Sequence, residues 1–79
     1  PLNFNIEIMD FTINEHKENL KRLNIDNYMS LIGENVYYIN EYYGHHKVID
    51  WCDDKSEYLL EYKNDRFWSN PFRINKVID

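Results

Sequence analysis

A single cysteine, Cys52, stands in a chain of 79 residues, and this is the feature that most restricts the fold. A domain of this size buries only about 60 to 65 per cent of the surface that its unfolded chain exposes, so its stability margin is small. Small secreted domains compensate with disulfides, and one cysteine cannot form a disulfide within the chain. We therefore expect a reducing compartment, and a core built from aromatic side chains.

Aromatic residues are available for such a core, because the chain contains seven tyrosines, four phenylalanines and two tryptophans. Each of these rings can bury roughly 150 to 250 Å². No apolar run is long enough for a membrane span, and the first residues do not resemble a secretory signal. From these features we expect a cytoplasmic protein.

The first eleven residues predict a strand. Apolar and polar residues alternate along residues 2–11, which is typical of a strand with one buried face. The apolar positions on one parity are Leu2, Phe4, Ile6 and Ile8.

A helix is predicted to follow this strand. Thr12 and Glu15 have the spacing of a capping box, in which each side chain accepts a hydrogen bond from the other residue's free backbone amide at the start of a helix. Four residues then recur at three- and four-residue spacing, which indicates an amphipathic helix ending near Asn24. They are Ile13, His16, Leu20 and Leu23. We expect His16 to be a hydrogen-bonded residue of the core rather than a catalytic base, and residues 27–31 to add a short helical turn.

The remainder of the chain predicts five short strands separated by turns. The turn signals are Gly44, residues 53–56, the Asn64–Asp65 pair and Pro71. A tight hairpin is expected at Asn64–Asp65 because both residues tolerate positive φ. The expected strands are residues 36–43, 47–52, 57–63, 66–68 and 73–78.

Residues 31–79 resemble the small SH3-like barrels, which include the SH3 and Tudor-type modules. The resemblance rests on strand rhythm: residues 33–36 lead the first strand, 48–51 and 58–62 follow, and 70–72 break the chain before 74–78. It implies a module that binds peptides or nucleic acids through aromatic side chains. No proline-peptide groove or methyl-lysine cage can be placed on individual residues, so no ligand of these families is inferred. The expected fold class is α+β, a single domain over residues 1–79. In it, a strand plus helix (1–32) packs on a small antiparallel, SH3-like curled sheet or barrel (33–79).

The net charge of −5 argues against direct binding to a nucleic-acid duplex, since such binding depends on Lys and Arg. Acidic residues gather instead around one predicted hairpin. Alternate positions of a strand recur every roughly 6 to 7 Å, close to the spacing of phosphates along a nucleic-acid strand, which suggests a DNA mimic. The alternative is a solvated face partly compensated by lysine. The residues concerned are Asp50, Asp53, Asp54, Glu57, Glu61 and Asp65.

Residues of metal-ligating and nucleophilic type occur in one region, around His45, His46 and Cys52. Adjacent histidines on a strand point to opposite faces, and a structural zinc site requires four converging ligands. A Cys52 nucleophile would need an oxyanion-binding turn, yet the chain has only two glycines and no motif of this kind. We expect no metal, no cofactor and no enzymatic activity.

Aromatic residues are the strongest indication of function. Both parities of the predicted strand 36–43 carry rings, so one set is expected to lie on the surface, where Tyr and Trp favour protein interfaces. The alternative is an aromatic-rich core covered by the N-terminal helix, and the two are compatible. The binding residues predicted among the rings are Tyr37, Tyr38, Tyr42, Tyr43, Trp51, Trp68 and Phe72, and among the acids Asp53, Asp54, Glu57 and Glu61.

These features predict a small acidic, non-catalytic protein-binding factor. The abundance of residues with AT-rich codons suggests a phage or mobile element, whose product would act in the host cytoplasm as an inhibitor or adaptor that blocks a host enzyme or defence complex. One alternative is a single-stranded nucleic-acid module, in which surface rings stack on bases. Its phosphate contacts would come from Lys63, Arg66, Arg73 and Lys76. Another is a homodimer in which surplus rings meet across a two-fold axis.

Overall fold

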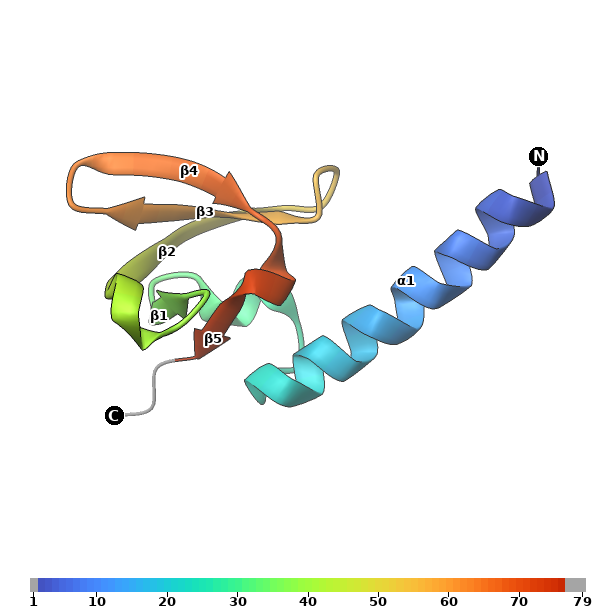
Figure 1. The fold of residues 1–79 in the computed structure, drawn as a ribbon, viewed down its shortest axis with the longest axis horizontal. Helices are drawn as coiled ribbons and strands as arrows, with labels where there is room; N and C mark the ends of the chain where they lie inside the picture. The colour runs from blue at the N-terminus through green and yellow to red at the C-terminus, as the bar shows by residue number, and fades with distance from the viewer. Residues whose placement is uncertain (1, 77–79) are drawn as a thin grey trace.

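The computed structural model in Figure 1 describes the backbone of residues 2–76 and the side chains of residues 13–76. One α-helix, α1 (Leu2–Leu23), precedes a five-stranded antiparallel sheet, so the fold is α+β as predicted. The strands are β1 (Asn35–Tyr38), β2 (His45–Cys52), β3 (Glu57–Tyr62), β4 (Asp65–Ser69) and β5 (Ile74–Lys76). Within the described residues, three 3-10 helices lie in the connections: η1 (Tyr28–Leu31) between α1 and β1, η2 (Glu41–Tyr43) between β1 and β2, and η3 (Pro71–Arg73) between β4 and β5.

The prediction of an N-terminal strand is wrong, because residues 2–11 belong to α1. The reason is that the helical spacing of apolar residues, predicted only from Ile13 onward, also continues toward the N-terminus. Spacings of four and three alternate without a break along the whole helix, which is the repeat of a helical stripe. The positions are Leu2, Ile6, Met9, Ile13, His16, Leu20 and Leu23. No glycine or proline interrupts residues 2–23, so Thr12 lies inside the helix instead of capping it.

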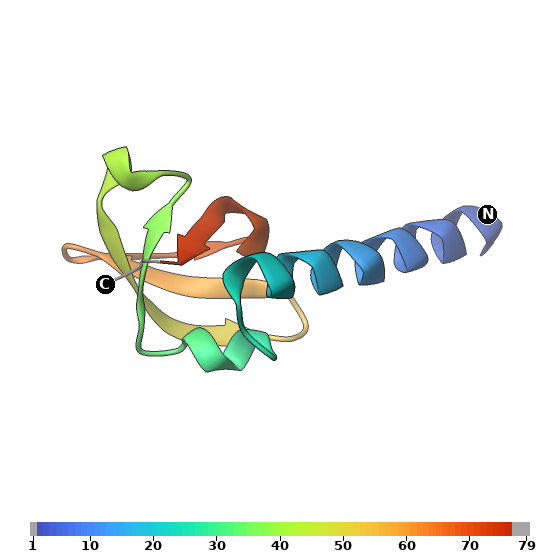
Figure 2. The ribbon, with the colours of Figure 1, turned by 90° about the horizontal axis from the view of Figure 1, so that it is seen from below.

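The end of α1 is close to its predicted position. The helix ends at Leu23, and Asn24 then adopts a φ of 57°, the left-handed conformation that commonly terminates helices. Lys21 and Arg22 occupy the last turn, where positive charge suits the helix dipole. Figures 1 and 2 show that the N-terminal half of α1 projects beyond the sheet, and the molecule is correspondingly elongated, 43 × 23 × 21 Å. None of the helices in the described part of the chain has the apolar length needed to cross a bilayer.

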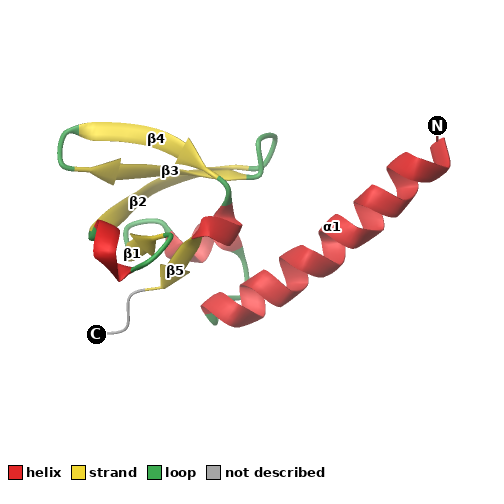
Figure 3. Ribbon diagram, viewed as in Figure 1, coloured by secondary structure: helices red, strands yellow, loops and turns green. Residues whose placement is uncertain are grey.

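The sheet is an open meander with one returning strand (Figure 3). Its strand order is β4-β3-β2-β1-β5, so β5 comes back to lie beside β1, with Tyr38 opposite Ile74. β4 and β5 form the two edges, and the sheet does not close into a barrel. A bulge between Val48 and Asp50 shifts the register of β2 against β3.

The strands predicted over 47–52, 57–63 and 66–68 are present with ends one or two residues away, as β2, β3 and β4. Two other differences change the connections between strands. The strand expected over residues 36–43 ends at Tyr38, because Ile39 takes a φ of 67° and the chain then turns into η2. The tight turn expected at Asn64–Asp65 lies one residue earlier: Tyr62 pairs with Asp65, and Lys63 carries the positive φ. The short helical turn predicted over 27–31 is present as η1, and the turn over 53–56 is confirmed. Of the last predicted strand, residues 77 and 78 lie outside the described residues.

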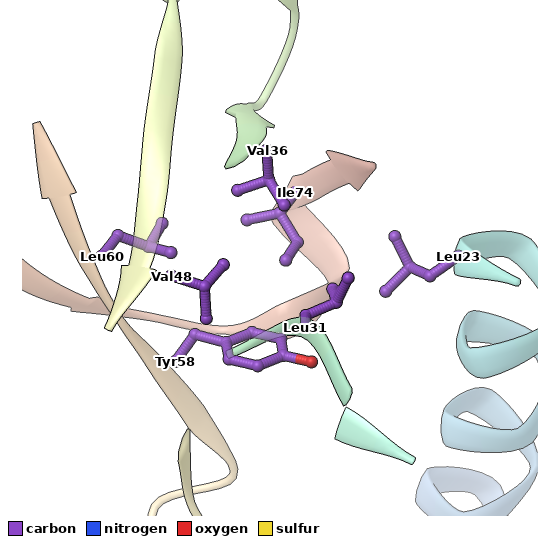
Figure 4. Packing of buried hydrophobic residues seen from close by; sticks show 7 residues of the cluster. All are labelled: Leu23, Leu31, Val36, Val48, Tyr58, Leu60 and Ile74. Atoms are coloured by element: carbon purple, nitrogen blue, oxygen red, sulfur yellow. The ribbon is translucent and has the colours of Figure 1, made fainter. Parts of the chain in front are cut away.

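The core unites the end of α1 with the sheet (Figure 4). Its fully buried members are mainly aliphatic: Leu23, Leu31, Val36, Val48, Leu60 and Ile74, together with Tyr58. The expectation of an aromatic core is therefore only partly met, because most of the rings near this centre are half-buried around its edge. The half-buried side chains packed against it are Ile25, Tyr28, Tyr38, Trp51 and Phe67.

The one buried aromatic residue of the core is anchored by a hydrogen bond. Tyr58 donates its hydroxyl to the carbonyl oxygen of Tyr28 at 2.5 Å, which fixes η1 against β3. Burial raises the pKa of the Tyr58 hydroxyl well above its usual value, and the neighbouring Tyr28 adds to the effect. Burial also raises the pKa of Tyr28, although the hydrogen bond from Asn19 opposes this.

Candidate protein-binding surface

Exposed apolar side chains gather on the connection between β1 and β2. Tyr42 is 89% exposed, Tyr43 is 50% exposed and Ile39 is 45% exposed. The three residues lie within five positions of each other, and we refer to them as the loop surface. Exposed aromatic and β-branched residues lose favourable burial, so their concentration on one loop makes this loop the candidate binding surface.

Ile39 is held in place by the β5 side of the sheet. Its backbone amide donates to the carbonyl oxygen of Arg73 at 2.6 Å, and the Asn75 side-chain amide donates to its carbonyl oxygen at 2.9 Å. Its φ of 67° is rare for a β-branched residue and costs roughly 1–3 kcal/mol. The two hydrogen bonds maintain this conformation, in which the Ile39 side chain remains largely exposed.

The tyrosines of the loop surface stand on a capped 3-10 turn. The Asn40 side chain accepts a hydrogen bond from the Tyr42 amide at 2.9 Å and so caps η2. At the other end, the Gly44 amide donates to the carbonyl oxygen of Glu41, and Gly44 has φ 84° and ψ 178°. The two rings meet edge to face with centroids 5.8 Å apart. The loop surface is therefore exposed on a backbone that its own hydrogen bonds define.

A groove continues from the loop surface along α1. Phe72, which is 39% exposed, lies on η3 with its ring 5.1 Å from that of His16. Hollows of about 450 and 480 Å³ flank this residue, and both include Phe72 and Arg22 in their walls. We refer to them together as the Phe72 groove. It is lined by Asn14, Glu15, Glu18, Asn19, Arg22, Ile39, Phe72, Arg73 and Asn75.

Arg22, which lines both hollows, joins α1 to β5. Its Nη2 donates to the carbonyl oxygen of Ile74 at 2.8 Å, and its Nη1 donates to Asn75 at 2.6 Å. Its Nε and Nη2 also donate to the buried Asn19, whose own amide donates to the carbonyl oxygen of Pro71 at 3.1 Å. These neutral acceptors fix the guanidinium, and no carboxylate among the described side chains pairs with it.

Two of the predicted binding rings lie against the core. Tyr38 is half-buried, with its ring 5.1 Å from Phe67 and 5.5 Å from His46. Trp51 is half-buried, 4.4 Å from Tyr28 and 4.8 Å from Tyr58. Both therefore have a clear packing role.

Two further predicted rings, Trp68 and Tyr37, do not belong to the loop surface. Trp68 is 38% exposed on the edge strand β4, with the Lys55 ammonium 5.1 Å from its ring centre. Tyr37 is half-buried and meets His45 edge to face at 4.8 Å. The structure thus distributes the seven predicted rings over several places.

The acidic residues do not form a regular row. Glu57 and Glu61 are four residues apart on β3, about 13 Å for an extended strand, which is twice the phosphate-like spacing. Glu61 is also paired with Arg66 at 2.8 Å. Asp53 accepts a hydrogen bond from the Trp51 indole at 2.5 Å, and Asp54 is exposed in the same turn. Two of the four predicted carboxylates are therefore engaged within the molecule.

The histidines have structural surroundings. His46 is buried, stacks on Tyr62 with ring centres 4.4 Å apart and contacts the carbonyl oxygen of Gly44 at 3.0 Å. His16 forms the predicted hydrogen bond, with its Nδ1 2.6 Å from the Tyr28 hydroxyl. Within the described residues, no three side chains of ligand type converge on a point where a metal ion could bind.

Sequence reasoning missed Ile39 and Arg22. An isoleucine with positive φ carries no sequence signal, and the neighbouring Asn40 would be the expected residue for that conformation. Arg22 could have been singled out by its i,i+4 spacing to Glu18, but that spacing predicts an ion pair which the structure does not contain.

Comparisons with protein-family models, with curated proteins and with solved structures each find no match for this chain. The loop surface and the Phe72 groove are therefore the features of this chain from which a function can be inferred.

Proposed function

We propose that this chain is a small, non-catalytic protein-binding factor, an inhibitor or adaptor whose main contact with its partner is the loop surface. The observation that carries this proposal is the exposure of Ile39, Tyr42 and Tyr43 on a backbone fixed by hydrogen bonds. Tyrosine covers a large area with few rotatable bonds, and a preformed loop loses little entropy on binding.

The strand arrangement supports the finer proposal of an SH3-like binding module. The β1–β4 meander, with β5 returning beside β1 after the short η3, is compatible with such a fold although the sheet is open. In modules of this kind function depends on the binding surface rather than the fold, so the proposal still depends on the loop. The acidic charge and small size also suit a phage or mobile-element inhibitor acting in a host cytoplasm, which remains a proposal.

Protein binding is favoured over a single-stranded nucleic-acid module by the positions of the cations. Two of the four residues expected to contact phosphates interact within the molecule: Arg66 is paired with Glu61, and Lys63 lies 5.3 Å from the ring centre of Tyr62. The net charge of −5 opposes a polyanion further.

The test is affinity purification of the tagged chain from an extract of the cells that produce it, with and without nuclease. We expect one protein to be retained in stoichiometric amount after nuclease treatment. A Tyr42→Ala/Tyr43→Ala double variant should lose this protein. Met29→Ala is the matched control, because Met29 is 62% exposed but lies on η1, at the other end of β1 from η2 (Figure 2).

Retention that disappears with nuclease would instead support the nucleic-acid module. Equal retention by the wild type and the tyrosine variant would rule out the loop surface as the contact.

A further inference from the structure

The Phe72 groove has an unbalanced distribution of charge. Glu15 and Glu18 line only the part along α1, and Arg73 lines only the part next to β5. Arg22 borders both parts and reaches toward β5. Phe72 lies between them and belongs to both parts. The groove therefore has an acidic end, an apolar centre and a basic end.

None of these charges is neutralised within the described side chains, where the one ion pair joins Glu61 to Arg66. Glu18 precedes Arg22 by four residues, the spacing that favours an ion pair on a helix. Arg22 turns away instead, toward Ile74 and Asn75, and Glu18 remains exposed. The groove thus retains carboxylates at one end and guanidinium charge at the other.

We propose that the Phe72 groove receives a short extended segment of the partner protein that carries a basic residue, an apolar residue and an acidic residue in that spatial order. The basic side chain faces Glu15 and Glu18, and the apolar one packs on Phe72. The acidic one faces the guanidinium groups of Arg22 and Arg73. This proposal rests on the proposed protein-binding function and adds the chemistry of the ligand. Complementary charge at both ends would set the direction of the segment as well as its affinity.

Helix geometry sets the spacing of the two charges on that segment. Glu18 and Glu15 lie four and seven residues before Arg22, or roughly 6 and 10 Å along the helix axis. An extended chain advances about 3.3 Å per residue, so the complementary charges should be two or three residues apart. The apolar residue falls between them.

The test is selection of peptides from a randomised twelve-residue display library on the immobilised full chain. We expect enriched sequences to place a basic and an acidic residue two or three positions apart, with an aromatic or aliphatic residue between them. A synthetic peptide of the enriched sequence should then bind Glu18→Lys and Arg73→Glu about five- to tenfold more weakly than the wild type. Phe72→Ala should bind it at least tenfold more weakly.

Reciprocal substitution distinguishes direct contact from disturbed folding. A peptide with its basic residue changed to glutamate should regain affinity for the Glu18→Lys variant, which a misfolded variant could not produce. Enrichment of peptides without this charge order, absence of any enriched sequence, or failure of the reciprocal pair would each overturn the groove proposal. If the captured partner still depends on Tyr42 and Tyr43 in that case, the proposed function stands while the groove assignment fails. If it does not, both fail.

Discussion

The backbone amide of Ile39 donates to the carbonyl oxygen of Arg73 at 2.6 Å, joining the β1–β2 connection to the end of η3. This bond places the loop surface next to the Phe72 groove, because Ile39 and Arg73 both line its basic end. It also holds the backbone of Ile39 in the left-handed region, a conformation whose energy the rest of the fold must offset.

Replacing Ile39 with asparagine should therefore increase the stability of the fold and weaken the binding of the partner. Asparagine tolerates positive φ, so Ile39→Asn should raise the free energy of unfolding by about 0.5–1 kcal/mol. The same change removes an apolar contact and should weaken partner binding. Urea denaturation and the nuclease-treated capture assay measure the two effects. A variant that is less stable than the wild type would show that the Ile39 side chain belongs to the packing instead.

Tyr38 at the end of β1 and Tyr42 on η2 should differ in their effect on stability. Tyr38→Ala should destabilise the fold by about 2 kcal/mol, because the ring packs on Phe67 and against the core. Tyr42→Ala should change the free energy of unfolding by less than about 0.5 kcal/mol, since the ring is 89% exposed. Thermal melts of the two variants give this comparison. Similar losses for both would contradict the division between core and surface rings.

The attachment of α1 should depend on Arg22. Arg22→Ala removes hydrogen bonds to Asn19, Ile74 and Asn75 and should cost about 1–2 kcal/mol. Lys21→Ala is the matched control, because Lys21 is exposed in the same helical turn and should have little effect. Hydrogen exchange should show faster exchange in the last turns of α1 for the arginine variant alone. Unchanged exchange there would mean that hydrophobic packing of Leu23 suffices to hold the helix.

Alkaline pH should destabilise the protein through its buried tyrosines. The pKa of Tyr58, raised by burial, means that the folded state keeps its proton at a pH where the unfolded state, with a pKa of about 10, loses it. Stability is then fully present below pH of about 10 and falls above it, by at most about 1.4 kcal/mol per pH unit for each such group. Tyr28 acts in the same direction.

Denaturant midpoints between pH 7 and 11 test this dependence. Tyr58→Phe should be less stable at pH 7, because the carbonyl oxygen of Tyr28 loses its donor, and its alkaline decline should be shallower. An equally steep decline in this variant would assign the effect to other groups.

The elements that sequence could predict are those with local signals. Gly44, the 53–56 turn and the alternation that buries Tyr58 and Leu60 each depend on a few neighbouring residues, and the structure contains all three. The prediction of an N-terminal strand failed because the alternation of apolar and polar residues over residues 2–8 is short. Apolar residues in the same stretch also fit the three- and four-residue spacing of α1. Choosing between these periods needs the whole 22-residue helix in view.

The candidate surface was only partly predictable for a different reason. Tyr42, Tyr43 and Phe72 stand out as rings, but sequence parity could not separate them from Tyr38 and Trp51, which pack inward. That separation depends on where β1 ends. The strand ends at Tyr38 because Ile39 is held by Arg73 and Asn75, more than thirty residues away. Such long-range constraints leave no local pattern.

Gly44 provides the sharpest test of whether the shape of the loop, and not only its side chains, determines binding. Its φ of 84° and ψ of 178° fall in a region that essentially only glycine occupies, and an added Cβ would lie 3.3 Å from Cε1 of Tyr62. Gly44→Ala should therefore destabilise the fold by about 1–3 kcal/mol and displace η2.

Gly33→Ala is the matched control for this strain. Gly33 also has a positive φ, 92°, but a Cβ there meets nothing within 4 Å, and the residue precedes β1 instead of following η2. Both variants should melt at lower temperature, but at a temperature where both remain folded only Gly44→Ala should lose the captured partner. Because the tyrosines are intact in both, a difference in binding can come only from how the loop holds them. Equal binding by the two variants would show that the partner reshapes the loop on contact, and that the conformation fixed by Ile39 and Gly44 is not required for recognition.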